Sequence, residues 1–264
     1  MNRKLVSKLM LGLSLSSFIG MFQYADINNV SNNNNIEEAL SHQKSDQIVR
    51  MNIINKLPSI GFRNLLSNLN FLQFLKYFGD DESRERTGYS FSPDFLTSVI
   101  EYDPYYRMFY LFLSESTTFY AGQPDKTVSL MEKGLSSPNA HKPSDSYYVW
   151  RYKGIDELLF LNDSQAAQAS FRMAAEWASK SDDLESDLIA TLSRNTAESL
   201  AINPTSNRAK ISAWSSILTT SFDENTRQQA IEKISELGGE VVFSEEGGVR
   251  INYPEETYKN ETPK

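Results

Sequence analysis

The residues in this sequence that could do acid–base or metal chemistry are two histidines and two clusters of acids. His42 and His141 both lie in polar segments without periodic apolar residues, which predicts loops. A catalytic dyad or a histidine metal site needs side chains held on rigid elements. We therefore predict solvated loop histidines, with no catalytic role and no metal bound to them.

The acidic clusters lie at 79–86 and 180–187, where the sequence reads GDDESRER and KSDDLESD. Both lack the alternating ligand spacing and central glycine of a calcium loop. We interpret the first as a charged loop and the second as the acidic start of a helix at Asp182 to Glu185. The absence of cysteine from the sequence excludes thiolate chemistry. The sequence also contains no nucleophile elbow and no glycine-rich phosphate loop, so we predict a non-enzymatic protein without a cofactor.

The charge of the chain is unevenly distributed. Its 264 residues carry a formal charge of −8, but residues 1–25 contain three basic residues and no acid. The remainder therefore holds 23 basic and 34 acidic residues, a formal −11. A body of this sign repels phosphate backbones, so we predict no nucleic-acid partner.

The first 25 residues have the pattern of an export signal. A basic start precedes an apolar run of 14 residues, Leu9 to Phe22. Ala25 is a possible last residue before cleavage, but Gln23 occupies a position where a small residue is preferred. Two alternatives stay open: a cleaved signal peptide, or a membrane anchor formed by residues 5–22, which is short of the roughly 20 residues of a spanning helix. A third is an amphipathic first helix of the folded body.

Either export alternative predicts that the acidic body is extracytoplasmic, in a periplasm, a lumen or at a cell surface. Residues 26–47 contain four consecutive asparagines and no apolar period, which favours a flexible tether. The tether would let the folded body stand away from the membrane.

From residue 48 to 238 apolar residues recur at intervals of three and four, which predicts a helical domain. One helix is expected over 48–57, and in the next Leu65, Leu69, Leu72 and Leu75 form one stripe that stops at Gly79. Another runs from Ser92 to the Asp103–Pro104 break. Residues 239–256 have the pattern of a β-hairpin with strands at 240–244 and 249–253. Residues 257–264 are predicted to form a disordered tail.

Two-helix units repeat along this domain at intervals of 34 to 40 residues. Aligning the second helices places Leu96, Met131 and Phe171 at equivalent positions. Units of this length cannot bury their own apolar faces, so they are expected to stack. Glycine and alanine at the helix crossings would let backbones approach, and Trp150 with Phe171 would fill the gap to the next unit.

These features resemble the tetratricopeptide-repeat (TPR) family over about 92–238. Trp150 and Gly154 match the first-helix pair of that family, and Ala167, Phe171 and Ala174 match the second-helix trio with one extra residue in the turn. A second match is Trp214 with Leu218, followed by Ala230, Ile234 and Leu237. Thr127, Met131 and Gly134 depart from the trio in the unit at 105–138. The resemblance implies an all-α fold, a right-handed α-solenoid of TPR-like hairpins, here with a small C-terminal β-hairpin.

Eight aromatic residues crowd into 102–120, too many for one buried helical face. Thick packing between repeats is one explanation, and a peptide-binding groove is the other. In the family, first helices line the inner surface, which implies that eight residues face a partner: Tyr148, Arg151, Ile155 and Leu158 in one repeat, and Met108, Leu111, Glu115 and Thr118 in the preceding one. Arg151 and Glu115 would supply polar specificity, and these positions hold no cluster of basic residues for a carboxylate clamp.

These observations predict an exported or membrane-anchored scaffold or assembly factor that binds a protein partner of a membrane-associated complex. The alternative is an extracytoplasmic module that binds a small molecule or a glycan in a tyrosine-rich groove. A closed aromatic pocket would favour the alternative, and an open groove the scaffold.

Overall fold

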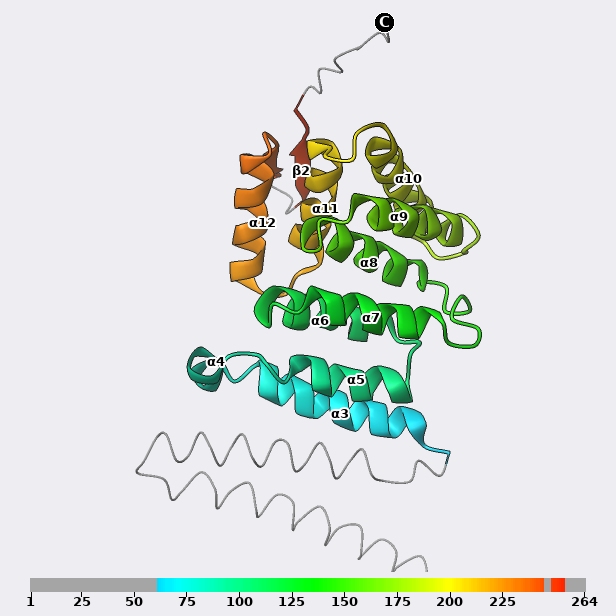
Figure 1. The fold of residues 1–264 in the computed structure, drawn as a ribbon, viewed down its shortest axis with the longest axis vertical. Helices are drawn as coiled ribbons and strands as arrows, with labels where there is room; N and C mark the ends of the chain where they lie inside the picture. The colour runs from blue at the N-terminus through cyan, green and yellow to red at the C-terminus, as the bar shows by residue number, and fades with distance from the viewer. Residues whose placement is uncertain (1–60, 245–247, 255–264) are drawn as a thin grey trace, which may run out of the picture. The chain divides into compact units, whose positions relative to one another are not determined.

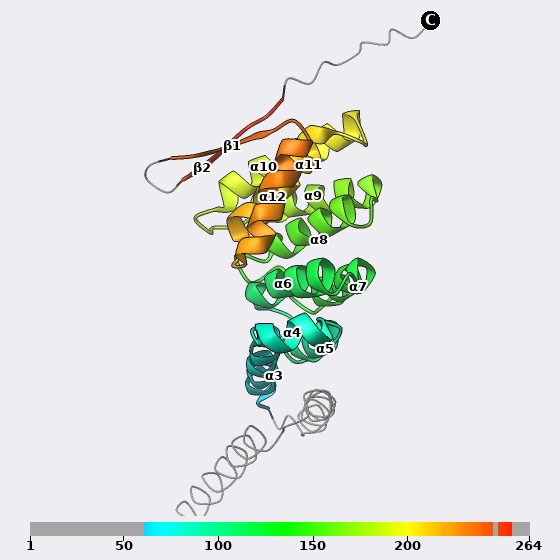
Figure 2. The ribbon, with the colours of Figure 1, turned by 90° about the vertical axis from the view of Figure 1, so that its left-hand side faces the viewer.

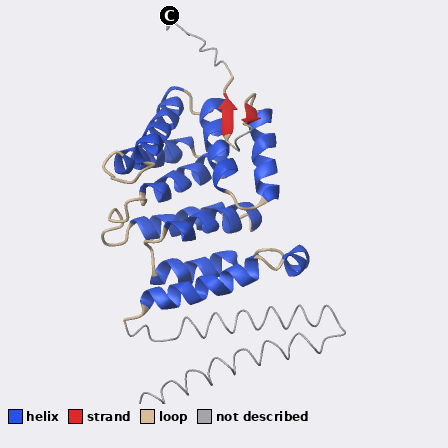
Figure 3. Ribbon diagram, turned by 180° about the vertical axis from the view of Figure 1, so that it is seen from behind, coloured by secondary structure: helices blue, strands red, loops and turns tan. Residues whose placement is uncertain are grey.

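A computed structural model of the protein describes residues 61–244 and 248–254. The predicted export segment (1–25), the tether (26–47), the helix expected at 48–57 and the tail (257–264) lie outside these residues. The described chain is mostly helical, with one two-stranded antiparallel sheet (Figure 3).

The helices follow one another with short connections. They are α3 (Arg63–Phe78), α4 (Asp81–Thr87), α5 (Ser92–Tyr102), α6 (Arg107–Leu113), the π-helix η1 (Ser114–Tyr120), α7 (Pro124–Leu135), α8 (Tyr147–Leu159), α9 (Ser164–Ala178), α10 (Ser186–Ile202), α11 (Asn207–Thr220) and α12 (Glu224–Glu236), before β1 (Glu240–Phe243) and β2 (Val249–Asn252). The predicted helix from Ser92 and the predicted β-hairpin are thereby confirmed.

Polar side chains mark where several helices begin. Asp163 accepts a hydrogen bond from the Ala166 amide at 2.9 Å, which caps α9 after the turn at Asn162. The first acidic cluster is not a loop as predicted. Asp80 accepts from the Ser83 amide at 3.2 Å and starts the short helix α4. A capping aspartate satisfies amides that would otherwise lack partners, and the sequence interpretation overlooked this role.

The helices lie in successive layers (Figures 1 and 2). Helix α3 packs against α5, η1 against α7, and α8 against α9. Helix α10 packs on α9, and α11 packs on α12 and also reaches α8. Helix α8 is therefore covered by α7 on one side and by α9 and α11 on others.

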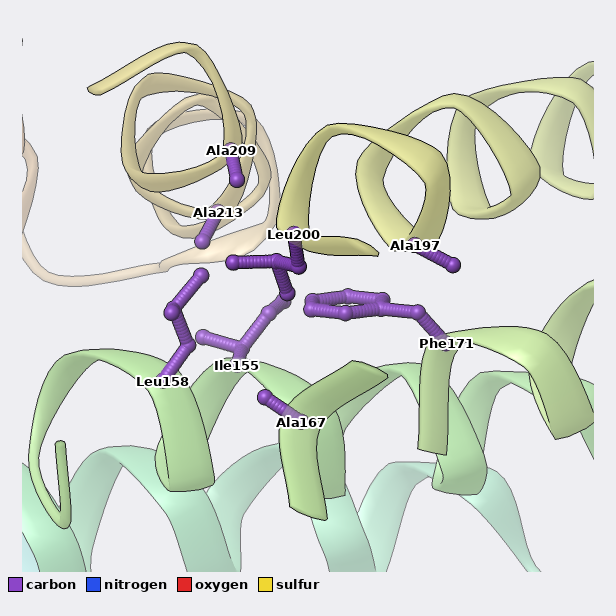
Figure 4. Close-up of a cluster of buried hydrophobic side chains, with 8 residues drawn as sticks. All are labelled: Ile155, Leu158, Ala167, Phe171, Ala197, Leu200, Ala209 and Ala213. Carbon is purple, nitrogen blue, oxygen red and sulfur yellow. The ribbon is translucent and has the colours of Figure 1, made fainter. Parts of the chain in front are cut away.

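The repeat positions identified in the sequence lie in the core. Leu96, Met131 and Phe171 are all fully buried, as equivalent positions in stacked units should be. Figure 4 shows Ile155 and Leu158 of α8 directed into a cluster that also contains Phe171 and small or branched residues of α10 and α11. This cluster joins four helices.

The expected role of Trp150 needs correction. Its ring packs edge-on against Trp177 of the same hairpin, with centroids 5.9 Å apart, whereas Phe171 lies in the four-helix cluster. Trp214 and Leu218 pack with Ala230 of α12 in a second core cluster.

The β-hairpin covers this second cluster. Glu240 pairs with Asn252 and Phe243 with Val249 in an antiparallel register. Val241 and Ile251 pack against the α11–α12 cluster, while Phe243 is exposed. The hairpin therefore leans on the last two helices, which a two-stranded sheet requires for stability.

Helix α3 buries a face other than its leucine stripe. Leu66, Phe74 and Tyr77 are buried, and Phe74 packs against the rings of Phe95 and of other aromatic residues. Aromatic side chains bury more apolar area than leucine, so the aromatic face of the helix turns inward. Of the predicted stripe, Leu65, Leu69 and Leu72 are exposed.

Candidate partner-binding site

The structure corrects the predicted groove. Seven of its eight residues are buried, namely Leu111, Glu115, Thr118, Tyr148, Arg151, Ile155 and Leu158, and Met108 is half-buried. The expectation that these side chains line an exposed groove is therefore wrong. The reason is the position of α8, which other helices cover on several sides.

Three of the eight residues nevertheless meet at one pocket. Leu111, Glu115 and Ile155 line a half-enclosed cavity of about 30 Å³ between α6, η1, α8, α11 and the start of α12. The other lining residues are Ser114, Phe119, Tyr152, Phe160, Ile217, Thr220, Ser221 and Thr226. A cavity of this size holds about one water molecule and is far smaller than a typical small-ligand site.

Glu115 is the acidic residue of this pocket. Its side chain is 7% exposed, and it accepts a hydrogen bond from the Ser221 hydroxyl at 2.6 Å. Burial raises the pKa of its carboxyl, and the nearby charge of Asp223 raises it further, while the bond from Ser221 opposes the shift. No lysine or arginine of the described chain forms an ion pair with it.

The π-helix η1 explains why polar residues face inward here. It continues α6 through Ser114–Tyr120, and its wider turn buries Glu115 together with Ser116 and Thr117. The Ser116 and Thr117 hydroxyls have no hydrogen-bond partner within the described residues. Single π-helical turns occur frequently at functional sites. The sequence signal for this segment is the polar run SESTT inside an aromatic helix, and the sequence interpretation missed it.

Asp156 is a second buried acid close to the pocket. It is fully buried on α8 and accepts from the Ser114 hydroxyl at 2.9 Å. Burial raises its pKa to about 7, although hydrogen bonds to the carboxylate oppose the shift. Sequence interpretation did not single out Asp156, because an acid in a helical pattern usually faces solvent.

Arg151, predicted to contact a partner, is instead an interior cation. It donates to the Ser193 hydroxyl at 3.1 Å and to the Ser216 hydroxyl at 2.6 Å, and no carboxylate within the described chain pairs with it. Burial lowers its pKa to about 10. Arg151 therefore joins α8 to α10 and α11 through neutral groups.

A buried ion pair lies on the same helix. Lys153 pairs with Glu157 one turn away, and the Ser170 hydroxyl donates to Glu157 at 2.6 Å. Glu132 of α7 lies 3.3 Å from the lysine nitrogen. This network connects α8 with α7 and α9, so its expected role is to fix the position of α8.

The aromatic crowding at 102–120 is explained mainly by packing. Phe109 and Tyr110 are buried, and Phe112 contacts the rings of Phe71 and Phe74 on α3. Tyr110 packs over Gly134, where an added Cβ would lie 1.9 Å from its hydroxyl. Only a side chain as small as glycine fits beside that ring.

The structure also bears on the predicted loop histidine, on metal sites and on membrane-spanning helices. His141 is exposed. Its ring lies edge-on to the ring of Trp177, with the two ring centroids 6.3 Å apart. Within residues 61–244 and 248–254, no three histidine or acidic side chains are grouped to hold a metal. No helix in that part of the chain has the length and apolar character needed to cross a bilayer.

No family model matches the sequence, and neither a curated protein nor a solved structure matches it. The similarity to TPR proteins continues to depend on the residue pattern alone.

Proposed function

We propose that this protein is a non-enzymatic protein–protein interaction module, a scaffold or assembly factor for a membrane-associated complex. On this proposal the layers of helices form a right-handed TPR-like solenoid. The stacked helix pairs support it, as do the small residues at their crossings, where Gly154 lies under the ring of Phe171. Solenoids of this kind characteristically present extended surfaces to partners.

The observation that carries the proposal is the exposed apolar face of α3. Phe62, Leu65, Leu69 and Leu72 have exposed fractions of 67, 56, 39 and 59%. The spacing of four and three residues places Leu65, Leu69 and Leu72 on one side of α3, and Phe62 immediately precedes the helix. A contiguous exposed apolar row marks a protein-interaction site, since isolated exposed leucines would not align. Its chemistry suits the apolar face of an amphipathic helix of the partner.

The proposed location follows from the N-terminal sequence. A basic segment followed by an apolar run supports export or anchoring, with the acidic domain outside the cytoplasm. Fractionation of cells that express the full chain tests the location separately from partner binding.

The test compares two substitutions of matched exposure. Full-length protein with a C-terminal tag is expressed in its native host, crosslinked, and purified from the membrane fraction. Leu72→Lys should abolish recovery of a defined partner, because it places a charge within the apolar row. Leu188→Lys, at a leucine of α10 that is 61% exposed, should leave recovery unchanged. Equal recovery with both variants would exclude the α3 face as the docking surface.

The second candidate function is an extracytoplasmic module that binds a small molecule or a glycan. The aromatic lining of the cavity favours it, because Phe119, Tyr152 and Phe160 line its wall, and a ligand would have to open the cavity, which has room for about one water. A glycan requires many polar contacts, and the lining is mainly apolar. A small ligand with a single polar group is therefore the better match within this alternative.

A further inference from the structure

A larger pocket lies between the α7–α8 connection and the loop that follows α9. Its volume is about 370 Å³, which is within the range of small-ligand sites, roughly 300–1,000 Å³. Unlike the cavity beside Glu115, it is lined mainly by polar and charged residues. These are His141, Lys142, Ser144 and Ser146 from the α7–α8 connection, and Lys180, Ser181 and Asp182 after α9, together with Trp177 of α9 itself.

Hydrogen bonds between the two connections hold the frame of this pocket. The Ser181 hydroxyl donates to the Ser144 carbonyl oxygen at 2.6 Å. At the start of α8, the Tyr147 hydroxyl donates to the Asp183 carboxylate in the loop after α9. The pocket is therefore bounded by two segments that are bonded to each other, and its shape does not depend on one loop alone.

The pocket is a basic region on an acidic domain. Lys142 and Lys180 line it with one acid, Asp182, whereas the chain after residue 25 holds 23 basic and 34 acidic residues. Lys180 pairs with Glu176 at 2.6 Å, but Lys142 forms no ion pair within the described residues. The N-terminus of α8 also lies at the pocket, through Ser146, and the positive end of a helix attracts anions. An anionic group is therefore favoured beside Lys142.

Ser146 supplies a buried hydroxyl at this end of the pocket. It is 8% exposed and directly precedes α8, but its side chain makes no cap hydrogen bond to the helix. Among the described residues its hydroxyl has no other hydrogen-bond partner, and it lines the pocket. Buried hydroxyls are normally bonded, so this one is available to a ligand.

Trp177 gives the pocket one aromatic wall. It is half-buried, and its ring is held nearly perpendicular to that of Trp150, with centroids 5.9 Å apart. The C–H groups of a sugar ring can pack on an indole, while the sugar hydroxyls need hydrogen-bond partners around it. The Ser144 hydroxyl and the Asp182 carboxylate are partners of this kind, since a carboxylate accepts from hydroxyls.

We propose that this pocket binds an acidic sugar, a pyranose that carries a carboxylate or a sulfate group. The sugar ring packs on Trp177, and the acidic group lies at Lys142 and the start of α8, where Ser146 donates to it. The hydroxyls of the sugar bond to Ser144 and Asp182. The proposal does not rest on the α3 docking surface, because the two regions share no residue.

The test measures binding of sodium D-glucuronate to the full-length protein in detergent by isothermal titration. Two further probes separate its chemistry: D-glucose has the ring without the charge, and sodium D-gluconate has the charge without the ring. All titrations are made at one sodium concentration. Wild-type protein should bind glucuronate at least about tenfold more tightly than either probe, because each lacks one group that the pocket recognises. Equal binding of glucuronate and glucose, or of glucuronate and gluconate, would overturn the proposal.

Charge reversal at two exposed lysines locates the site. Lys142→Glu should weaken glucuronate binding at least about tenfold. Lys233→Glu makes the same change of net charge on α12, outside the pocket, and should bind as the wild type does. Equal affinities of the two variants would place the ligand elsewhere and contradict the proposal.

A third variant tests the space itself. Ser144 is exposed and lines the pocket, so Ser144→Leu should fill part of the volume and block binding while Lys142 stays in place. The far-ultraviolet circular dichroism of every variant must match that of wild type, which separates loss of binding from loss of fold. Unchanged binding by a folded Ser144→Leu would count against this pocket.

The acidic group is identified with D-glucose sulfated at its exocyclic hydroxyl. Tighter binding of glucuronate would assign a carboxylate to the ligand, and tighter binding of the sulfated glucose would assign a sulfate ester. Binding of neither probe would overturn the proposal, while leaving the α3 surface untouched.

Discussion

The ring of Phe171 lies directly on Gly154, where an added Cβ would approach three ring carbons to 3.3 Å. The two residues belong to different helices of one hairpin, so the glycine sets how closely α8 and α9 approach. Phe171 also contacts the cluster that α10 and α11 complete (Figure 4). This one relationship connects the sequence pattern with the packing of four helices.

Phe171→Ala should lower the free energy of unfolding by about 3–5 kcal/mol, because it removes buried apolar area and leaves a cavity. Chemical denaturation of the full-length protein measures the change. Phe243→Ala is the matched control, because Phe243 is 56% exposed in β1 and should cost less than about 1 kcal/mol. Equal losses would contradict the assignment of Phe171 to the core.

Because Arg151 is buried, we expect its substitution to affect the stability of the fold and not the binding of a partner. Arg151→Ala should destabilise the fold by about 2–4 kcal/mol, because it removes the packing of a buried side chain that joins three helices. Arg151→Met keeps most of the volume and removes the buried charge, so it should cost at least about 1 kcal/mol less. Thermal unfolding of both variants measures these losses. If Arg151→Ala left the stability unchanged, the prediction that Arg151 faces a partner-binding groove would be restored.

The buried pair on α8 should behave as a unit. Lys153→Ala leaves Glu157 buried without its cation, with an expected loss of about 3–5 kcal/mol. The double variant Lys153→Met/Glu157→Leu removes both charges and should recover at least half of that loss. A double-mutant cycle with the single variants Lys153→Met and Glu157→Leu measures the coupling, and simple additivity of those two changes would count against a buried ion pair.

Asp156 predicts a pH dependence of stability. Its folded pKa of about 7 lies above its ordinary value of 3.8, so the folded state retains the proton longer than the unfolded state. Stability is therefore lost as pH rises between these two values, by on the order of 4 kcal/mol, and the loss is complete above the folded pKa. The groups that face Asp156 are Ser114, Thr118 and the neighbouring Glu157.

Asp156→Asn isolates this effect. The amide oxygen can still accept from Ser114, but position 156 no longer ionises. The variant should be more stable than wild type at pH 8 and show little advantage at pH 4, by urea denaturation at both values. If the stability gain of Asp156→Asn were the same at pH 8 and at pH 4, that result would contradict a raised pKa for the Asp156 carboxyl.

The sequence predicted the helices because they depend on local periodicity. Leu96, Met131 and Phe171 were aligned from spacing alone and are all buried. The β-hairpin was also predictable, since a turn rich in glycine separates two β-branched segments. These features need no knowledge of what packs against them.

The site was not predictable in the same way. Which face of a helix turns outward depends on neighbours, and α8 is covered on several sides, so Tyr148 and Ile155 became interior. In α3 two apolar stripes compete, and the aromatic one containing Phe74 is buried while Leu72 is exposed. The π-helical turn at Glu115 has no spacing signature of its own, because it shifts the period within one helix.

The most direct test of the proposed interaction surface is photo-crosslinking in living cells at single positions. The photoreactive residue p-benzoylphenylalanine replaces Leu72 in one strain and Leu188 in another, at sites of similar exposure. The proposal predicts a single defined protein adduct from position 72 in the membrane fraction and none from position 188. No adduct from position 72, or the same adducts from both positions, would contradict the claim that the α3 face binds a protein partner.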